Sequence, residues 1–170
     1  MSASLVPAER TDLPLLENLF QFYYYDFTEL LGGHVGADGR FSPPALDVYW
    51  QDSWRHPFLV RVDEHLAGFA LVHHRSRITG DTGTWDVAEF FVMRQHRRRG
   101  VGSFAALELF ERFRGPWEVR QIRANVAATH FWRAVIARHT GGRYREMTYD
   151  DERWRGPVQW FDNTLPASRS

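Results

Sequence analysis

Apolar and polar positions change period several times along the chain, and each change marks the boundary of a predicted element. Residues 5–6 form a short extended segment, and residues 13–27 then carry apolar side chains at helical spacing. Residues 30–44 are interrupted repeatedly by Gly and Pro, which indicates a loop. Helical spacing returns over residues 45–54 and predicts a second, shorter helix.

The pattern then becomes extended. Residues 57–62 and 66–74 flank the connection Asp63-Glu64-His65 and predict an antiparallel hairpin. A third extended segment covers residues 84–93. Its continuous apolar run near the end indicates a strand buried on both faces.

The rest of the chain is predicted to contain two helices and three strands. The predicted elements are a helix over residues 102–114, a strand over 118–126, a helix over 129–140 that Thr129 caps and Gly141-Gly142 ends, and strands over 143–149 and 156–163. Alternation is confined to the middle of the chain, so the order predicts an α+β protein with a mixed sheet and helices on its faces. No repeat or linker divides the chain, and we expect one domain over residues 1–170.

Composition narrows the classes of function. Lys+Arg and Asp+Glu number 21 each, and every basic residue is Arg. A nucleic-acid-binding domain usually carries a basic excess, so we expect no nucleic-acid partner. The chain has no Cys, and its His residues lack metal-ligand spacing with carboxylates, so no metal is predicted. No apolar run approaches the ~20 residues of a membrane span. The N-terminus does not resemble a secretory signal, and we expect a cytoplasmic protein without a membrane partner.

A run of arginines stands beside a glycine turn at residues 97–103, Arg-Arg-Arg-Gly-Val-Gly-Ser. A predicted strand ends just before this turn and a predicted helix begins within it. The first amides of a helix lack internal acceptors, and glycines allow a close backbone approach, so a pyrophosphate is the natural ligand. A capped turn with solvated arginines is the alternative. The spacing matches neither the P-loop nor the dinucleotide fingerprint, since Lys is absent and position 105 is Ala.

Two motifs carry a family resemblance. Residues 97–102, Arg-x-x-Gly-x-Gly, resemble the Gln/Arg-x-x-Gly-x-Gly/Ala signature of the GCN5-related N-acetyltransferase (GNAT) family. Residues 125–132, Asn-x-x-Ala-x-x-Phe-Trp, lie where that family places Asn-x-x-Ala-x-x-x-Tyr. The resemblance implies a GNAT-like acyl-CoA N-acyltransferase fold. Its central, mostly antiparallel sheet would have about seven strands and splay between the fourth and fifth. Acetyl-CoA would be the acyl donor.

The resemblance also assigns residues to the donor. The main chain of residues 90–92 would pair with the pantetheine arm as an added strand, and the glycine-turn amides would hold the pyrophosphate. Some of the neighbouring arginines would reach phosphate. The implied cofactor-binding residues are Phe90, Phe91, Val92, Arg97, Arg98, Arg99, Gly100, Val101, Gly102, Ser103, Asn125 and Trp132.

The reaction needs a base for the amine and a proton for the departing thiolate. Asp86 and Glu89 are the candidate bases. Their separation in a regular strand places them on opposite faces, so at most one would face the substrate. We prefer Glu89, a carboxylate within an apolar run, for which an ion pair with an arginine is the alternative role. Trp132 replaces the family's usual Tyr, and an indole N–H cannot supply a proton near neutral pH.

The end of the first helix supplies the candidate acceptor-binding residues Tyr24, Tyr25, Asp26 and Glu29. Two carboxylates there would suit a cationic amine. We therefore predict an N-acetyltransferase that acts on a small-molecule or peptide amine by direct attack in a ternary complex, as a monomer or homodimer. The alternative is an acyl-CoA-binding module with weak or no catalysis, which the loss of the usual Tyr at Trp132 favours.

Overall fold

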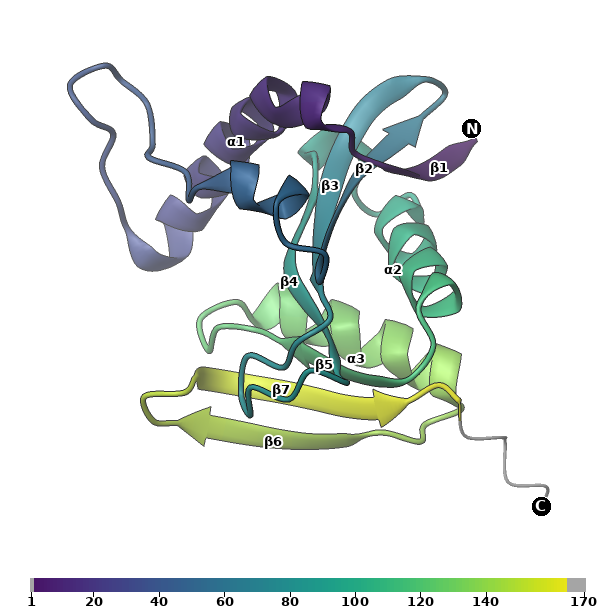
Figure 1. Ribbon diagram of the computed structural model, residues 1–170. Coiled ribbons are helices and arrows are strands. Elements are labelled where there is room, and N and C mark those ends of the chain that lie inside the picture. Colours follow the sequence, from purple (N-terminus) through teal and green to yellow (C-terminus); the bar gives the residue numbers. More distant parts are fainter. Residues whose placement is uncertain (1, 165–170) are drawn as a thin grey trace.

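The computed structural model describes residues 2–164, and the extreme ends of the predicted domain, residues 1 and 165–170, lie outside the described residues. The order of elements agrees with the predicted one (Figure 1). The strands are β1 Ala3–Pro7, β2 Arg55–Val62, β3 His65–His73, β4 Trp85–Val92, β5 Pro116–Arg120, β6 Arg145–Asp150 and β7 Arg155–Asp162. The helices are α1 Leu13–Leu31, α2 Val101–Arg112 and α3 Val126–Thr140, with short 3₁₀ helices η1 Arg10–Asp12, η2 Leu46–Trp50 and η3 Arg94–His96.

All of these strands belong to one seven-stranded sheet in the order β1-β2-β3-β4-β5-β7-β6. Every neighbouring pair is antiparallel except β4 and β5, which run parallel. The crossover between these two strands is α2, as a parallel pair requires. The predicted mixed, mostly antiparallel sheet is therefore confirmed.

Each face of the sheet buries its own apolar cluster, which fixes the helices on that face. Under α1, Phe20 stacks on Phe69 of β3 with ring centroids 4.7 Å apart. Under α2 and α3, Phe110 and Trp117 meet edge to face at 5.0 Å. Burying one such side chain contributes about 1.5–3 kcal/mol. The predicted placement of helices on both faces is confirmed.

The sheet splays between β4 and β5. These strands pair only from Trp85–Trp117 to Val87–Val119. Beyond this stretch β4 continues to Val92 against β3, whereas β5 ends at Arg120. In Figure 1, β7 and β6 accordingly lie almost crosswise to β2 and β3. The second half of β4 has a free edge on the β5 side, and the predicted splay is confirmed.

Two predicted elements are shorter than expected. The helix predicted over residues 45–54 is the 3₁₀ helix η2. Its buried residues Leu46 and Tyr49 are three positions apart, which is the period of a 3₁₀ helix. The strand predicted over residues 118–126 ends at Arg120, because the chain then turns with the Asn125 N–H bonded to the Ile122 carbonyl at 2.9 Å.

The start of α3 also differs from the prediction. Asn125, rather than Thr129, is the N-cap, and its side-chain oxygen accepts a hydrogen bond from the Ala128 N–H at 3.0 Å. Thr129 lies inside the first turn and donates its hydroxyl to the Asn125 carbonyl at 3.2 Å. The helix ends as predicted at Gly141, whose φ is 63°. The earlier start places Asn125 at the splay of the sheet.

Candidate active site

Two cavities lie where α1, β4 and the first turns of α3 come together. The first, here called the turn cavity, has a volume of about 650 Å³ and is lined by Arg97, Gly100 and Ser103 among others. The second, the strand cavity, has about 870 Å³ and runs along β4 past Asp86 and Glu89. Some residues line both cavities: Tyr23, Phe27, Phe90, Asn125, Ala128 and Trp132. The two cavities therefore adjoin.

The glycine turn leaves backbone amides exposed at the start of α2. Gly100 is the N-cap with φ 81°, a left-handed conformation that disfavours residues with a side chain. The first amides of α2 have no acceptor within the helix and carry the positive end of its dipole. At Gly102 a Cβ would lie 3.3 Å from the Phe131 ring, so a side chain there would crowd the wall of the cavity. The turn has the geometry of an anion-binding cradle.

The predicted cofactor residues gather at this cavity with two exceptions. The residues that line it are Phe90, Phe91, Val92, Arg97, Arg98, Gly100, Gly102, Ser103, Asn125 and Trp132. The Val101 side chain instead packs in the core at 1% exposure, so only its main chain can contribute. Arg99 is exposed to solvent and lines neither cavity.

The arginines of the turn cavity differ in how they are held. Arg97 donates its Nε to the Val92 carbonyl at 2.6 Å and pairs with Asp26 through its guanidinium. Arg94 pairs with the same carboxylate at 2.9 Å. Among the described residues, Arg98 has no ion-pair partner although it lines the cavity. It is the arginine best placed to bind an added anion.

The free edge of β4 faces the splay. The Met93 N–H donates a hydrogen bond to the carbonyl of Ala67 in β3 at 2.8 Å, so the backbone polar groups of Met93 point toward β3. Because the backbone N–H and C=O groups of successive residues alternate between the two edges of a strand, those of Val92 and Phe90 point toward the splay. The contact from Arg97 to the Val92 carbonyl agrees with this direction. The remaining groups on this edge can pair with an extended ligand, as in strand addition.

A β-bulge brings Asp86 and Glu89 to one face of β4, which corrects the expectation that they lie on opposite faces. Glu89 pairs with Leu71 and Asp86 with His73, while Ala88 is left without a partner in the register. Leu71 and His73 are two positions apart on β3 and so share a face. The extra residue of the bulge shifts the alternation by one position. Both carboxylates line the strand cavity.

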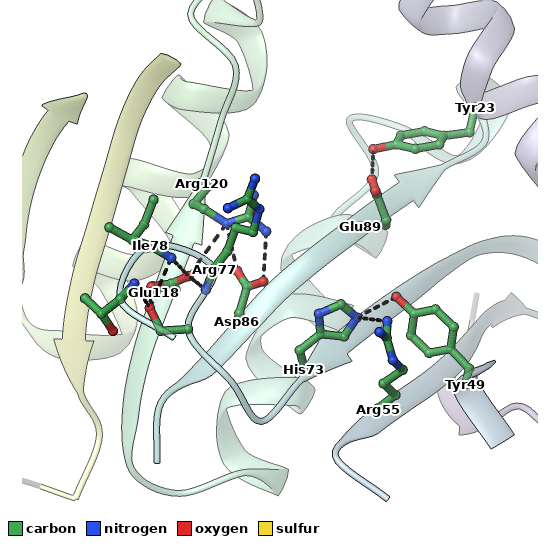
Figure 2. Close-up of polar contacts among 12 residues, drawn as sticks. Tyr23, Tyr49, Arg55, His73, Arg77, Ile78, Asp86, Glu89, Glu118 and Arg120 are labelled. Atoms are coloured by element: carbon green, nitrogen blue, oxygen red, sulfur yellow. Dashed lines mark hydrogen bonds and ion pairs between the residues drawn. The ribbon is translucent and has the colours of Figure 1, made fainter. Parts of the chain in front are cut away.

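Asp86 is bound on both oxygens. Arg120 of β5 donates to them at 3.1 and 2.8 Å, and the Asp86 residue is fully buried. Burial raises the pKa of the Asp86 carboxyl, while the Arg120 guanidinium opposes the rise. Arg120 also lies over the Trp154 ring at 4.5 Å. The ion pair joins β4 to β5 at the splay, and Figure 2 shows it apart from Glu89.

Glu89 accepts a hydrogen bond from the Tyr23 hydroxyl at 2.5 Å (Figure 2). Burial is the main cause that raises the pKa of the Glu89 carboxyl, and the bonds and charges of Tyr23 and Arg120 partly offset it. The charge of Asp86 adds to the rise. A carboxylate with a raised pKa accepts protons more readily, which suits a general base.

The predicted acceptor residues are distributed over both cavities. Tyr24 lines the strand cavity, and its role in acceptor binding stays a prediction. Asp26 and Glu29 line the turn cavity instead, where Asp26 holds two arginines. Tyr25 is 64% exposed and lines neither cavity. Sequence reasoning favoured Tyr24 and Tyr25, whereas it is Tyr23 that contacts Glu89. The signal for Tyr23 is its spacing of three, four and seven positions from the buried Phe20, Leu19 and Leu16, which places it on the same face of α1.

A second polar group in the strand cavity has no counterpart in the sequence-based prediction. The His73 Nε2 lies 2.7 Å from the Tyr49 hydroxyl and 3.3 Å from Nη1 of Arg55. A guanidinium can only donate, so Nε2 is the acceptor and Nδ1 carries the proton. Burial, with nearby arginines, lowers the pKa of His73 to about 4 and keeps it neutral near pH 7. These residues come from η2, β2 and β3, so no local motif reveals them.

Trp132 forms part of the wall between the cavities. Its ring meets Phe90 edge to face, with centroids 4.9 Å apart, and the residue is 4% exposed. Asn125 uses its side-chain oxygen for the α3 cap and lines both cavities. Residues 2–164 contain no group of three or more His, Asp or Glu side chains that could hold a metal ion. Within the same range, no helix is long and apolar enough to cross a membrane.

The chain resembles known acetyltransferases in structure. An acetyltransferase from Thermus thermophilus is 19% identical, with a TM-score of 0.62 over 94% of this chain and 95% of that one. The ribosomal-protein-S18-alanine N-acetyltransferase of Escherichia coli is 14% identical, with a TM-score of 0.60 over 99% of both chains. The PaiA N-acetyltransferase of Thermoplasma acidophilum in complex with coenzyme A is 10% identical, with a TM-score of 0.62 over 95% and 99%.

Sequence comparison identifies the family. No curated protein matches the chain. The profile of the Acetyltransferase (GNAT) family matches residues 15–135, which include most of α1, the glycine turn and most of α3. The predicted resemblance is therefore confirmed, and the chain belongs to the GNAT family of acetyltransferases.

Proposed function

We propose that the protein is an N-acetyltransferase that transfers an acetyl group from acetyl-CoA to a small-molecule or peptide amine, with both substrates bound at once. The observation that carries the proposal is the junction of the two cavities beside the hydrogen-bonded pair of Glu89 and Tyr23. The turn cavity suits the donor and the strand cavity suits the acceptor.

The residues of the turn cavity fit coenzyme A. The exposed amides from Gly100 to Ser103 and the unpaired Arg98 would hold the pyrophosphate. The free edge of β4 at Phe90 and Val92 would pair with the amides of the pantetheine arm. The complex of the Thermoplasma relative with coenzyme A supports this choice of donor. When bound, acetyl-CoA supplies an activated thioester.

Glu89 is the proposed general base. It takes a proton from the acceptor ammonium, directly or through a water molecule, and the freed nitrogen attacks the thioester carbon. The carbon–sulfur bond then breaks and releases the thiolate, while the nitrogen gives its second proton to solvent water and becomes the neutral amide. The Val92 N–H, which points toward the splay, is the proposed donor to the developing oxyanion. Asp86 has both oxygens bound to Arg120, so we assign it a positioning role in place of base catalysis.

Tyr23 is the proposed route for the proton that the thiolate needs. Trp132 cannot supply it, and burial raises the pKa of Tyr23 well above its ordinary value of 10.0, so Tyr23 alone is a poor acid. A thiol has a pKa of about 8.5. Tyr23 contacts Glu89 and lines both cavities. After its hydroxyl rotates, Tyr23 passes its proton to the thiolate as Glu89 returns the amine's proton to the phenol oxygen.

A screen for thiol release tests the proposal. Purified protein with acetyl-CoA is offered amino acids, polyamines, amino sugars and peptide N-termini, and calorimetry measures acetyl-CoA binding in parallel. We expect binding together with turnover of at least one class of amine. Binding without turnover of any amine would favour the acyl-CoA-binding module, whose supporting observation is Trp132. Absence of binding would overturn the donor assignment.

A further inference from the structure

Two arginines of the strand cavity, Arg55 and Arg77, lie outside the ion pair between Asp86 and Arg120. The cavity is lined by three arginines, Arg55, Arg77 and Arg120, and by two carboxylates, Asp86 and Glu89. Asp86 and Arg120 neutralise each other in their paired contact. Arg55 pairs with Asp52 through its Nε alone, and Arg77 has no ion-pair partner among the described residues, so both guanidiniums keep nitrogens that can bind an added anion.

The turn that carries Arg77 is fixed by hydrogen bonds, whereas the Arg77 side chain is exposed. Glu118 is fully buried and accepts hydrogen bonds from the Ser76 hydroxyl and the Arg77 N–H, both at 2.5 Å (Figure 2). The Ile78 N–H approaches the same carboxylate at 3.3 Å. These contacts fix the turn that carries Arg77. Its guanidinium has no ion-pair partner in the part of the chain that the structure describes.

The guanidinium of Arg55 is oriented by neighbouring residues, and one of its nitrogens stays available for a ligand. The guanidinium lies 4.1 Å over the Trp54 ring, and its Nε bonds to Asp52 at 2.9 Å. Its Nη1 contacts the neutral His73, so the contacts made to described residues leave Nη2 for another acceptor. Paired nitrogens of a guanidinium match the oxygens of a carboxylate or phosphate.

The carboxylates that would recognise a polycation lie elsewhere. Asp26 and Glu29 line the turn cavity, and Asp26 is already paired with Arg94 and Arg97.

Along β4, Glu89 pairs with Leu71 and Asp86 pairs with His73. Leu71 and His73 are two residues apart, so Glu89 lies about 7 Å along the sheet from His73. His73 is the residue that Arg55 contacts. An acceptor spanning this distance would place its amine at Glu89 and its other end near the arginines.

We infer that the acceptor is a primary amine that also carries an anionic group, a carboxylate or a phosphate, held by Arg55 and Arg77 while the amine lies at Glu89. This inference rests on the proposed function and specifies the substrate class of the same site. A cationic polyamine would meet two arginines in the same place and is disfavoured by charge repulsion.

Rates with matched amines test the inference. The panel is glycine, 3-aminopropionate and 4-aminobutyrate, each beside its uncharged amide, with O-phosphoethanolamine beside ethanolamine, and spermidine. We expect the anionic member of at least one pair to have a kcat/KM about 10-fold or more above its neutral partner, as for charge-assisted hydrogen bonds. The better of the carboxylate and phosphate series identifies the group. Equal rates within every pair, or a preference for spermidine, would overturn the inference.

Arginine variants locate the preference. Arg77→Gln removes an exposed charge and should leave the fold intact, and Arg55→Gln is the second variant. Each should reduce the anionic preference by about 10-fold, because the rate with the anionic amine falls more than the rate with its amide. Arg75→Gln is the matched control, because Arg75 lies over Trp54 at 4.6 Å but does not line the cavity. An unchanged preference in both test variants contradicts the assignment.

Binding separates this inference from the proposed function. With coenzyme A present, calorimetry compares N-acetyl-4-aminobutyrate, N-acetyl-3-aminopropionate and N-acetyl-phosphoethanolamine with their uncharged counterparts, in wild type and in Arg77→Gln. Tighter binding of an anionic form that the variant loses supports the anion site even if no amine is turned over. Equal binding of charged and uncharged forms rejects the anion site, whether or not the protein acetylates amines.

Discussion

At the scale of residues, the chemistry of Glu89 depends on its immediate neighbours. Burial raises the pKa of its carboxyl, and Tyr23 and Arg120 moderate that rise. Asp86, on the same face of β4, has a different role because Arg120 occupies both of its oxygens. Two carboxylates close together in sequence are thus divided into a proposed base, Glu89, and an ion-paired residue, Asp86.

Glu89→Gln should lower kcat by about 10²- to 10⁴-fold, the usual contribution of a general base. Affinity for coenzyme A should stay the same, since Glu89 does not line the turn cavity. In the wild type, kcat/KM should rise with pH through the Glu89 pKa, which lies above its ordinary value of 4.5. The variant should lack this acid limb. A variant that keeps the limb, measured by thiol release across pH, would remove Glu89 as the base.

The same substitution should have the opposite effect on stability. The folded-state pKa of Glu89 is raised, so its contribution to stability is present at low pH and is lost as pH rises through the folded pKa. Near pH 8 Glu89→Gln should therefore unfold at a higher temperature than the wild type, and near pH 4 the difference should shrink. Calorimetric melting at both pH values measures it. A melting temperature of Glu89→Gln at pH 8 equal to or below that of the wild type would contradict the conclusion that burying the charged Glu89 carboxylate destabilises the fold.

Tyr23→Phe should act through Glu89 as well as on the thiolate. The Tyr23 hydrogen bond lowers the Glu89 pKa, so its loss should move the acid limb of kcat/KM to higher pH. Loss of the proton route should also lower kcat by about 10²-fold. Tyr24→Phe is the matched control, because Tyr24 lines the strand cavity but makes no hydrogen bond to Glu89 among residues 2–164. Equal pH profiles for the two variants would exclude the relay.

At the scale of elements, the glycine turn was predictable because its signal is local. The glycine spacing within residues 97–103 marks the start of α2, which the structure places at Val101 after the left-handed Gly100. The bulge at Ala88 was not predictable, because an extra residue in a strand leaves no mark in an apolar run. The error about the faces of Asp86 and Glu89 follows from that one residue. The late start predicted for α3 arose because both Asn125 and Thr129 are residues that cap helices.

Gly100→Glu should abolish measurable binding of acetyl-CoA, because it adds a side chain and a negative charge at the exposed amides of α2. Gly142→Glu is the matched control, since Gly142 has a φ of 82° against 81° for Gly100 and a Cβ at either position would meet open space. Strain should therefore be alike in the two variants, and only Gly100→Glu should lose affinity in calorimetry. Normal binding by a folded Gly100→Glu protein would refute the phosphate assignment.

At the scale of the whole molecule, the parts of the site that sequence could not reveal are those assembled over long distances in the chain. Arg55, His73 and Arg120 belong to β2, β3 and β5, and only the sheet register brings them to one cavity. The order of elements was predictable from hydrophobic period, and the GNAT-like fold was predictable from the resemblance that the two motifs carry. The acceptor side was not, because its side chains follow no shared motif.

The central claim is that donor and acceptor occupy adjoining cavities together and react directly. Initial rates measured over a grid of acetyl-CoA and amine concentrations test it, with an amine that gives turnover. We predict double-reciprocal lines that intersect, with coenzyme A competing against acetyl-CoA but not against the amine. The absence of Cys in the chain agrees with a reaction that has no acetyl-thioester on the enzyme. Parallel lines would indicate a covalent acetyl-enzyme and would contradict the account.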